Sequence, residues 1–382
     1  MKWIRWTHLS VSLIVIAASS GLRAQQFQSP VYYGTGTRTS EPAPVIASDL
    51  NGDGKLDLIV GDMNQGGVAV YLGNGDGTFQ SPTHTSVLSP GVLAAADLNQ
   101  DGIPDLVVLQ PLLGGRLMVF AGNGDGTFTP LAKYEIQDHP AGLVVGDFNG
   151  DGHLDVAVTS SNQGQSAAGY VTVLFGHGDG TLTRSARYRA GSHPWGIAAG
   201  DLNGDGHPDL VISDNNGSGG VTDTVFVLLN NGTGTFHIAS HYPLGVEAVA
   251  VNIADLNHDG KPDLVVASAF DQSVGILLSH GDGTFSAPVF YATNAGAEAP
   301  QALVVADFDL DGNPDIALVN AVGNPGLLYG KGDGTFQSAA GITLKQPGGS
   351  GIAVGDFDRD GAPDLVVPEF SAGDIAVLIN TQ

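Results

Sequence analysis

A nine-residue pattern, Asp-x-Asn/Asp-x-Asp-Gly-x-x-Asp, occurs seven times along this chain of 382 residues. Successive copies begin 48 to 54 residues apart, between short β-branched segments bounded by glycine. Such segments predict β-strands, and a period near 50 residues predicts a repeat architecture. The chain is therefore expected to fold as an array of small sheets. The copies begin at Asp49, Asp97, Asp147, Asp201, Asp255, Asp307 and Asp356.

Every copy has the composition of a cation-binding loop. Positions 1, 3, 5 and 9 carry oxygen-bearing side chains and position 6 is glycine, which is how a short loop surrounds a hard cation. Position 7 has no shared side-chain chemistry, which indicates a ligand from its backbone carbonyl. The predicted ligands at positions 1, 3, 5, 7 and 9 are Asp49, Asn51, Asp53, Lys55, Asp57; Asp97, Asn99, Asp101, Ile103, Asp105; Asp147, Asn149, Asp151, His153, Asp155; Asp201, Asn203, Asp205, His207, Asp209; Asp255, Asn257, Asp259, Lys261, Asp263; Asp307, Asp309, Asp311, Asn313, Asp315; and Asp356, Asp358, Asp360, Ala362, Asp364.

The charge of these loops indicates that they hold a cation. Each contains three aspartates, or four in the copies that begin at Asp307 and Asp356. A like-charge pair at about 4 Å costs about 4 kcal/mol at an effective dielectric constant of about 20. Oxygen donors without cysteine favour Ca²⁺ over zinc, and Mg²⁺ takes fewer protein ligands. We therefore expect up to seven Ca²⁺ ions, held most tightly by the two loops with the extra carboxylate.

Two other interpretations of the motif fit less well. Asp-Gly and Asn-Gly mark ordinary turns, but turns alone do not explain seven copies that keep four oxygen-bearing positions. An EF-hand loop opens in the same way but requires a glutamate at position 12 and helices on both sides. Position 12 is apolar in the first two copies, Val60 and Val108, and the flanks are strand-like.

Each repeat predicts four strands, in the order strand A, metal loop, strand B, variable loop, strand C, tight turn and strand D. In the first repeat we place them at 45–50, 57–61, 67–73 and 78–86. The C to D turn reads Gly-Asn-Gly-Asp-Gly-Thr-Phe from Gly73, and glycine supplies the positive φ that a tight hairpin needs. Seven such units predict an all-β, seven-bladed β-propeller of four-stranded blades, with strand A innermost.

The two ends of the sequence predict how the ring closes. The seventh repeat has a strand C at 374–379 and no D strand before Gln382. The N-terminal segment 26–33 resembles the D strands that begin at Thr78 and Thr284. We therefore expect this N-terminal strand to complete the last blade, because a closed ring leaves no strand edge open to aggregation.

Residues 1–24 have the layout of a secretory signal peptide. Lys2 and Arg5 precede an apolar run at 9–18, and Ala24 is a small residue before the expected cleavage. Because this run is shorter than the roughly 20 residues of a membrane span, we predict no membrane-spanning segment. The product is expected to be secreted or extracellular, periplasmic or surface-associated, with the propeller at 25–382. The chain contains no cysteine, so metal and ring closure are expected to stabilise it in place of disulfides.

Charge and motif content narrow the function. The formal net charge is −25, with 14 Lys and Arg against 39 Asp and Glu, which argues against nucleic acid as a partner. No His-Glu-x-x-His, Gly-x-Ser-x-Gly or P-loop motif occurs, so we expect no enzymatic activity. The alternative is that acid and base residues from distant blades meet in a polysaccharide lyase or hydrolase.

The repeats resemble FG-GAP repeats, also called VCBS repeats, over residues 26–382. The motif quoted above, followed by Gly-x-Gly-Asp-Gly-Thr-Phe, carries the resemblance. It is similar to the seven-bladed propeller of integrin α subunits, which implies Ca²⁺ in the A to B loops and a role in adhesion or ligand binding. Integrins keep the motif in only some blades, whereas all seven keep it here, so integrin partners do not transfer. A similar group of fungal lectins binds sugars, which makes carbohydrate a candidate ligand by analogy.

A ligand is expected on the face opposite the calcium loops. Alternating strand directions place the A to B and C to D loops on one face, and the variable B to C and D to A loops on the other. Variable loops on a rigid scaffold commonly carry function, and Trp195 in this region could stack on a sugar or pack between blades. We expect a binding or adhesion module for glycans or cell-surface proteins, with a purely structural scaffold as an alternative. No feature indicates an oligomeric state. Other residues expected on this face are His139, His193, Asp214, Glu298, Glu369 and Phe370.

Overall fold

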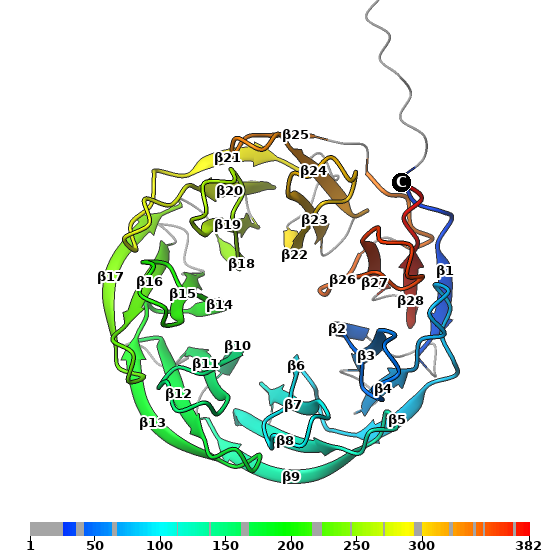
Figure 1. Cartoon of the computed structure of the whole chain (residues 1–382), viewed down its shortest axis with the longest axis horizontal. Coiled ribbons are helices and arrows are strands. Elements are labelled where there is room, and N and C mark those ends of the chain that lie inside the picture. The colour runs from blue at the N-terminus through cyan, green and yellow to red at the C-terminus, as the bar shows by residue number, and fades with distance from the viewer. Residues whose placement is uncertain are drawn as a thin grey trace, which may run out of the picture.

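Seven four-stranded antiparallel sheets stand as blades around a common axis in the computed structural model of the chain (Figure 1). The described residues form strands and turns, without a helix. The predicted seven-bladed propeller is confirmed. The structure describes residues 26–35, 42–62, 67–112, 114–136, 139–161, 168–215, 224–244, 247–269, 272–293, 300–320, 324–338, 341–346, 348–369 and 372–382, so the predicted signal peptide at 1–24 lies outside the described part.

Each blade runs from an inner strand A to an outer strand D, and its sheet pairs the strands in that order. Blades 1 to 7 consist, in the order A to D, of β2 (Pro42–Ser48), β3 (Asp57–Asp62), β4 (Gly67–Tyr71) and β5 (Thr83–Ser86); β6 (Val92–Ala96), β7 (Asp105–Gln110), β8 (Arg116–Gly122) and β9 (Phe128–Glu135); β10 (His139–Gly146), β11 (Asp155–Ser161), β12 (Tyr170–Gly176) and β13 (Leu182–Arg189); β14 (Pro194–Gly200), β15 (Asp209–Asp214), β16 (Thr224–Asn230) and β17 (Phe236–Pro243); β18 (Ala248–Ala254), β19 (Asp263–Ser268), β20 (Ser273–Leu277) and β21 (Val289–Ala292); β22 (Pro300–Ala306), β23 (Asp315–Asn320), β24 (Gly326–Gly330) and β25 (Phe336–Ser338); and β26 (Ala353–Gly355), β27 (Asp364–Glu369), β28 (Asp374–Leu378) and β1 (Val31–Gly34).

The hydrophobic core is divided among the spaces between neighbouring blades. In β3 all six residues are buried, because successive side chains of a strand point to opposite faces and both faces are covered here. Leu58 and Val60 pack with Val366 and Ile375 of blade 7, whereas Ile59 packs with residues of blade 2. The continuous apolar run of strand B therefore fills two core regions at once.

The ring closes as predicted, through the N-terminal strand. Strand β1 pairs antiparallel with β28, with Val31 opposite Val377 and Gly34 opposite Asp374. Beyond the strands, the Gln28 backbone N–H donates to Ile379 O at 2.8 Å, and Thr381 N–H donates to Gln26 O at 2.8 Å. Backbone hydrogen bonds between the two ends of the described chain thus complete blade 7.

The outer strand of blade 1 is shorter than expected. The prediction placed it at 78–86, but β5 begins at Thr83, and Phe79 makes only an isolated bridge with Gly73. Pro82 precedes β5 and has no N–H to donate to the ladder. Proline also directly precedes β1 and β21, which have isolated bridges at Phe27 and Phe285. The predicted strand C at 67–73 likewise ends at Tyr71 and continues only as the bridge at Gly73.

The inner strands end in small residues, as the crowding near the axis predicts. These residues are Ser48, Ala96, Gly146, Gly200, Ala254, Ala306 and Gly355, each directly before a metal loop. A Cβ on Gly355 would lie 2.5 Å from Leu56 Cδ1, which is closer than van der Waals contact allows. Because the blades converge here (Figure 1), strand A positions its metal loop against the neighbouring blade.

Candidate metal centres

The seven acidic loops occupy equivalent places, each between the inner strand A and strand B. Position 1 follows the last residue of strand A, and position 9 is the first residue of strand B, as Asp49 and Asp57 show in blade 1. Two short strands therefore hold both ends of each loop. The predicted ligand residues of all seven loops lie within the described ranges.

Backbone hydrogen bonds hold the aspartate side chains of positions 1 and 5 in the same way in every loop. In blade 1, Asp49 Oδ2 accepts from Gly54 N at 2.8 Å, and Asp53 Oδ1 accepts from Lys55 N at 3.0 Å. The corresponding bond from position 6 to position 1 recurs in all seven loops, as does the bond from position 7 to position 5. The oxygen atoms are thus preorganised by the loop's own backbone.

Position 4 has a backbone requirement that the sequence analysis missed. The residue there has positive φ in every loop, including the non-glycine residues Gln100, His258, Leu310 and Arg359, at 55° to 65°. Residues other than glycine rarely adopt a positive φ, so the surrounding hydrogen bonds impose it. Glycine at position 4 in three copies, Gly52, Gly150 and Gly204, was the signal for it.

The aspartate at position 9 is a buried structural element as well as a predicted ligand. Asp57 is 0% exposed, and its Oδ2 accepts from Leu50 N at 2.9 Å while its Oδ1 accepts from Gly73 N at 2.8 Å. Each carboxylate oxygen has two lone pairs, so these bonds leave acceptor capacity for a cation. The side chain joins the metal loop to the first residue of the C to D turn. The same pair of bonds is made by Asp105, Asp155, Asp209, Asp263, Asp315 and Asp364.

Burial changes the acidity of these aspartates. It raises the pKa of Asp209 to about 6 and the pKa of Asp315 and Asp364 to about 7, against an ordinary value of 3.8. Donated backbone N–H groups partly offset this effect, and the neighbouring aspartates of the loop add to it. A buried carboxylate near other carboxylates is ionised more readily when a cation lies beside it.

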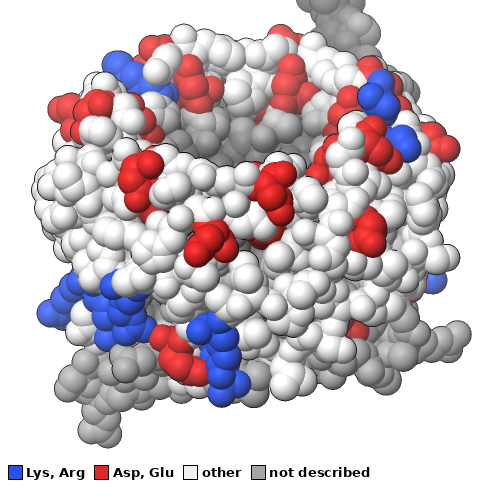
Figure 2. Space-filling model, turned by 60° about the horizontal axis from the view of Figure 1, so that its bottom comes forward, with Lys and Arg blue, Asp and Glu red and all other residues white. Residues whose placement is uncertain are grey.

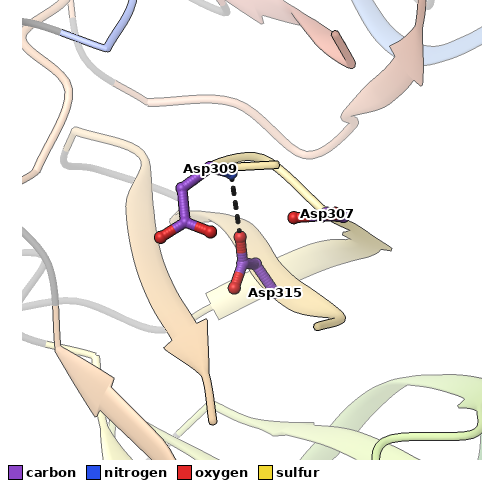
Figure 3. A group of neighbouring side chains, drawn as sticks. All are labelled: Asp307, Asp309 and Asp315. Atoms are coloured by element: carbon purple, nitrogen blue, oxygen red, sulfur yellow. Dashed lines mark hydrogen bonds between the residues drawn. The ribbon is translucent and has the colours of Figure 1, made fainter. Parts of the chain in front are cut away.

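In blades 6 and 7 the structure brings three carboxylates together. One oxygen from each of Asp307, Asp309 and Asp315 lies within 4.8 Å of the others, and Asp356, Asp358 and Asp364 form the same arrangement. Figure 3 shows Asp309 and Asp315 on the two sides of the loop, joined by the bond from Asp309 N to Asp315 Oδ2 at 3.3 Å. These all-oxygen groups fit a hard divalent cation. The position 5 carboxylates, Asp311 and Asp360, are not part of these groups.

Neighbouring blades hold the loops from outside. Gly77 N in the C to D turn of blade 1 donates to Phe357 O in the metal loop of blade 7 at 3.0 Å. Gly180, Gly283 and Gly334 make equivalent bonds to Leu98, Leu202 and Leu256 at 3.1 to 3.3 Å. The metal loops and C to D turns therefore share one face, as predicted, and each loop geometry depends on the adjacent blade.

On the opposite face, the structure corrects part of the predicted ligand surface. Asp214 and Glu369 are only 6% and 0% exposed. Asp214 accepts from the backbone of Ser192 and His193, and Glu369 accepts from Gln346 N at 2.9 Å. They fasten the incoming D to A connection to strand B, so they are structural. Glu298 and Phe370 lie outside the described residues.

Trp195 remains a candidate for ligand contact on this face. Its side chain is 48% exposed and lies near the start of β14, at the end of the blade remote from the metal loop. The Trp195 carbonyl accepts from Thr159 Oγ1 of blade 3 at 2.7 Å, which fixes the backbone. His193, just before Trp195 in the sequence, is half-buried. His139, at the start of β10, is exposed.

Asp214 and Glu369 belong to a set of polar residues that sequence reasoning missed. The sixth residue of strand B is polar and buried in every blade, at the end opposite the metal loop. These residues are Asp62, Gln110, Ser160, Asp214, Ser268, Asn320 and Glu369, all 6% exposed or less. Their signal in the sequence was a polar residue five positions after each loop's final aspartate.

Comparison with known proteins adds to this picture. A family model described as FG-GAP-like repeat matches residues 49–108, 97–158, 147–212, 203–266, 255–318 and 307–367. Among curated proteins, integrin alpha-6 of Gallus gallus is 28% identical over 151 residues, or 34% of this chain and 13% of its own length. Integrin alpha-7 of Homo sapiens is 30% identical over 155 residues, or 35% of this chain and 12% of its own length. The matches thus span only a small part of either integrin chain.

Solved structures share the fold at low sequence identity. An Agrocybe aegerita lectin that recognises non-reducing terminal N-acetylglucosamine has a TM-score of 0.54 and 21% identity, covering 89% of this chain and 86% of the lectin. A chain from the crystal structure of BBS1N in complex with ARL6DN has a TM-score of 0.63 and 14% identity, covering 93% and 97%. Across the described ranges, no helix has the length and apolar character needed to cross a lipid bilayer.

Proposed function

The chain belongs to the FG-GAP-like repeat family, and on this premise we propose that it is an extracellular, calcium-stabilised binding module for a glycan or a cell-surface protein. The observation that carries the ligand proposal is the half-exposed Trp195 on the face of the variable loops. Integrin alpha chains and a sugar-recognising lectin among its similar proteins support a binding role.

We propose that Ca²⁺ occupies all seven loops and acts structurally. The residues that would hold it are the side chains at positions 1, 3, 5 and 9, with the carbonyl of position 7. The bound ion would supply the positive charge that lets several ionised aspartates converge in one loop. The recurrent backbone bonds to Asp49 and Asp53 and their equivalents support this proposal, as do the convergent carboxylates of blades 6 and 7. Extracellular sites of this kind commonly bind with Kd of about 0.1 to 1 mM.

For the ligand, we propose that Trp195 supplies an apolar stacking surface. An indole ring offers a large flat face with a polar edge, which is why tryptophan is enriched at binding interfaces. Its backbone is anchored to blade 3 through Thr159, so the ring is presented from a fixed strand. Ligand binding is proposed to need no chemical step, and the protein is proposed not to be an enzyme.

A glycan array with the full chain in millimolar CaCl₂ tests this function. We expect discrete glycan hits that weaken when Trp195→Ala is used and disappear after chelation, because the variable face depends on the metal-stabilised blades. Phe290→Ala is the matched control, since Phe290 is 42% exposed but lies on the outer strand β21.

Equal loss of binding in both variants would argue against Trp195 as the contact residue. An array without hits, combined with no retention of purified cell-surface glycoproteins, would reject the binding function. Release of product from any polysaccharide on the array would overturn the proposal that the protein lacks catalysis.

A further inference from the structure

The lysine and arginine residues of the described part of the chain are unevenly distributed. Ten Lys and Arg lie in the described ranges, and five of them lie on the outer strands of blades 2 and 3 or beside them. We call these five the basic strip: Arg116, Lys133, Arg184, Arg187 and Arg189. Figure 2, in which the strands β9 and β13 at the lower side of Figure 1 come forward, shows two groups of blue side chains low on the outer wall. Most red side chains in this view lie higher, along the rim.

Strand register places the arginines of blade 3 on one face. Arg189, Arg187 and Arg184 pair with Tyr170, Thr172 and Leu174, which are alternate residues of β12. A bulge between Val173 and Leu174 adds one residue to β13. Without it, the odd spacing from Arg184 to Arg187 would put the two side chains on opposite faces. Three cations therefore point the same way along one exposed edge.

Blade 2 has the equivalent arrangement. Arg116 pairs with Glu135, and Met118 pairs with Lys133, so Arg116 and Lys133 share the corresponding face. Arg184 Nη2 of blade 3 donates to Glu135 O at 2.5 Å. This contact shows that the arginine face of blade 3 is turned towards blade 2, and it makes the two groups neighbours.

A cavity opens beside the blade 2 cations. It has a volume of about 260 Å³ and lies between the end of blade 1 and the outer strands of blade 2. Its lining combines cations with apolar groups: Arg116 and Lys133 line it, as do Met118, Pro130 and Leu88. Leu88 is 63% exposed. The site therefore offers apolar lining beside two positive charges.

The strands that carry the strip contain few acidic residues. Within β8, β9, β12 and β13 the one acid is Glu135, whose Oε1 lies 3.0 Å from Lys133 Nζ and 3.3 Å from Arg116 Nε. These four strands thus hold five basic residues and one acidic residue, in a chain whose net charge is −25. By contrast, Lys55 and Lys261 lie in the metal loops and pair with Asp53 and Asp259.

We propose that the basic strip and the adjoining cavity bind an acidic polysaccharide, one that carries carboxylate or sulfate groups on its sugars. Arginine and lysine bind such groups by charge-assisted hydrogen bonds, and the cavity takes a sugar ring against its apolar wall. Single-stranded nucleic acid fits less well, because it needs exposed aromatic platforms. The ring of Phe120 in the cavity lining cannot act as such a platform, because the residue is only 2% exposed. The ring of Tyr170 is already in contact with Arg187, whose guanidinium carbon lies over it, 4.2 Å from the ring centre. This inference adds to the proposed binding function a second site, on the outer wall, and gives the class of ligand that this site takes.

The test measures the affinity of the full chain, with CaCl₂ present, for three polysaccharides, namely hyaluronan, chondroitin sulfate and uncharged dextran, and for duplex and single-stranded DNA. We expect the two acidic polymers to bind, with affinity that falls as NaCl is raised, and dextran not to bind. The double variants Arg187→Gln/Arg189→Gln and Arg116→Gln/Lys133→Gln should each weaken binding by about tenfold. Lys331→Gln/Lys345→Gln removes the same charge elsewhere and should change affinity less than about twofold. The melting temperature of each variant verifies folding.

The inference is overturned if the control variant weakens binding as much as the strip variants, if dextran binds equally well, or if duplex or single-stranded DNA binds more tightly than either acidic polymer. Absence of binding to all three polysaccharides, together with discrete neutral-glycan hits on the array, would reject the strip and leave the proposed function standing. Absence of any ligand in both experiments would reject both.

Discussion

The metal loops of blades 6 and 7 carry four aspartates each, whereas those of blades 1 and 5 carry three aspartates and a lysine at position 7. They share the backbone bond from position 6 to position 1: Asp307 Oδ2 accepts from Gly312 N at 2.9 Å, and Asp49 Oδ2 accepts from Gly54 N at 2.8 Å. The two kinds of loop differ in what lies beside their carboxylates. In blade 1, Lys55 Nζ lies 3.0 Å from Asp53 Oδ2, while in blade 6 three carboxylates converge.

This contrast separates two roles of the loop sequence. Hydrogen bonds from the backbone build the same loop in every blade, whatever side chain occupies positions 3 and 7. The number of carboxylates then sets how strongly the loop needs a cation, because like charges repel unless an ion lies between them. A lysine inside the loop supplies part of that positive charge itself.

Removal of Ca²⁺ is expected to have the largest effect on stability. At about 2 mM Ca²⁺ and Kd of about 0.1 to 1 mM, each site stabilises the fold by about 0.6 to 1.8 kcal/mol. Excess EDTA should therefore lower the melting temperature strongly, as measured by differential scanning calorimetry. During gradual chelation, the loops of blades 6 and 7 should lose metal last. An unchanged melting temperature would remove the basis of the comparison.

The next largest effect tests what the two kinds of loop share. Asp57→Ala and Asp315→Ala should each destabilise the protein by about 2 to 4 kcal/mol even in EDTA, because each leaves buried backbone N–H groups unsatisfied. Urea unfolding measures this cost. Asp53→Ala is the control, since Asp53 is exposed at the surface of the loop, and it should matter only when Ca²⁺ is present. A large cost for Asp315→Ala alone would show that the loops differ in more than charge.

Exchange of position 3 tests the charge difference directly. Asp309→Asn gives blade 6 the composition of the other loops and should weaken its Ca²⁺ affinity by about tenfold, because ligand charge tunes affinity. The reciprocal change Asn51→Asp should strengthen blade 1 by a smaller factor, since Lys55 stays beside Asp53. Calorimetric titration of each variant against the parent protein measures both shifts. Shifts of the same sign in the two variants would contradict a charge-based explanation.

A change of pH should act on the metal-free loops through the buried aspartate at position 9. Folding raises the pKa of Asp315 and Asp364 from 3.8 to about 7, so the unfolded chain binds fewer protons between these values. The metal-free protein should therefore be most stable below pH 3.8 with respect to these groups, and lose that contribution as pH rises through about 7. Ca²⁺ requires the ionised form, so its affinity should rise over the same range. Melting temperatures from pH 5 to 8 should fall in EDTA and change little in CaCl₂, because bound Ca²⁺ keeps these groups ionised throughout.

The sequence alone determined the architecture and the composition of the loops, because both depend on patterns among residues that are close together in the chain. The period of the acidic motif gave the number of blades, and the likeness of segment 26–33 to the D strands predicted the closure seen between β1 and β28. The alternation of oxygen-bearing residues predicted a cation site at every loop, and in blades 6 and 7 the structure brings three of the predicted carboxylates together.

Tertiary structure decided which of these residues are buried and which distant ones meet. Asp57 is a structural residue because the backbone N–H of Gly73, 16 residues later in the chain, donates to its carboxylate. Asp214 and Glu369 were taken from the predicted ligand face into the interior by the connections that cover them. The basic strip exists only because a bulge aligns three arginines and blade 3 packs against Glu135 of blade 2. Local patterns record what each segment prefers, but burial and charge neighbours depend on segments far apart in the chain, and only packing brings these together.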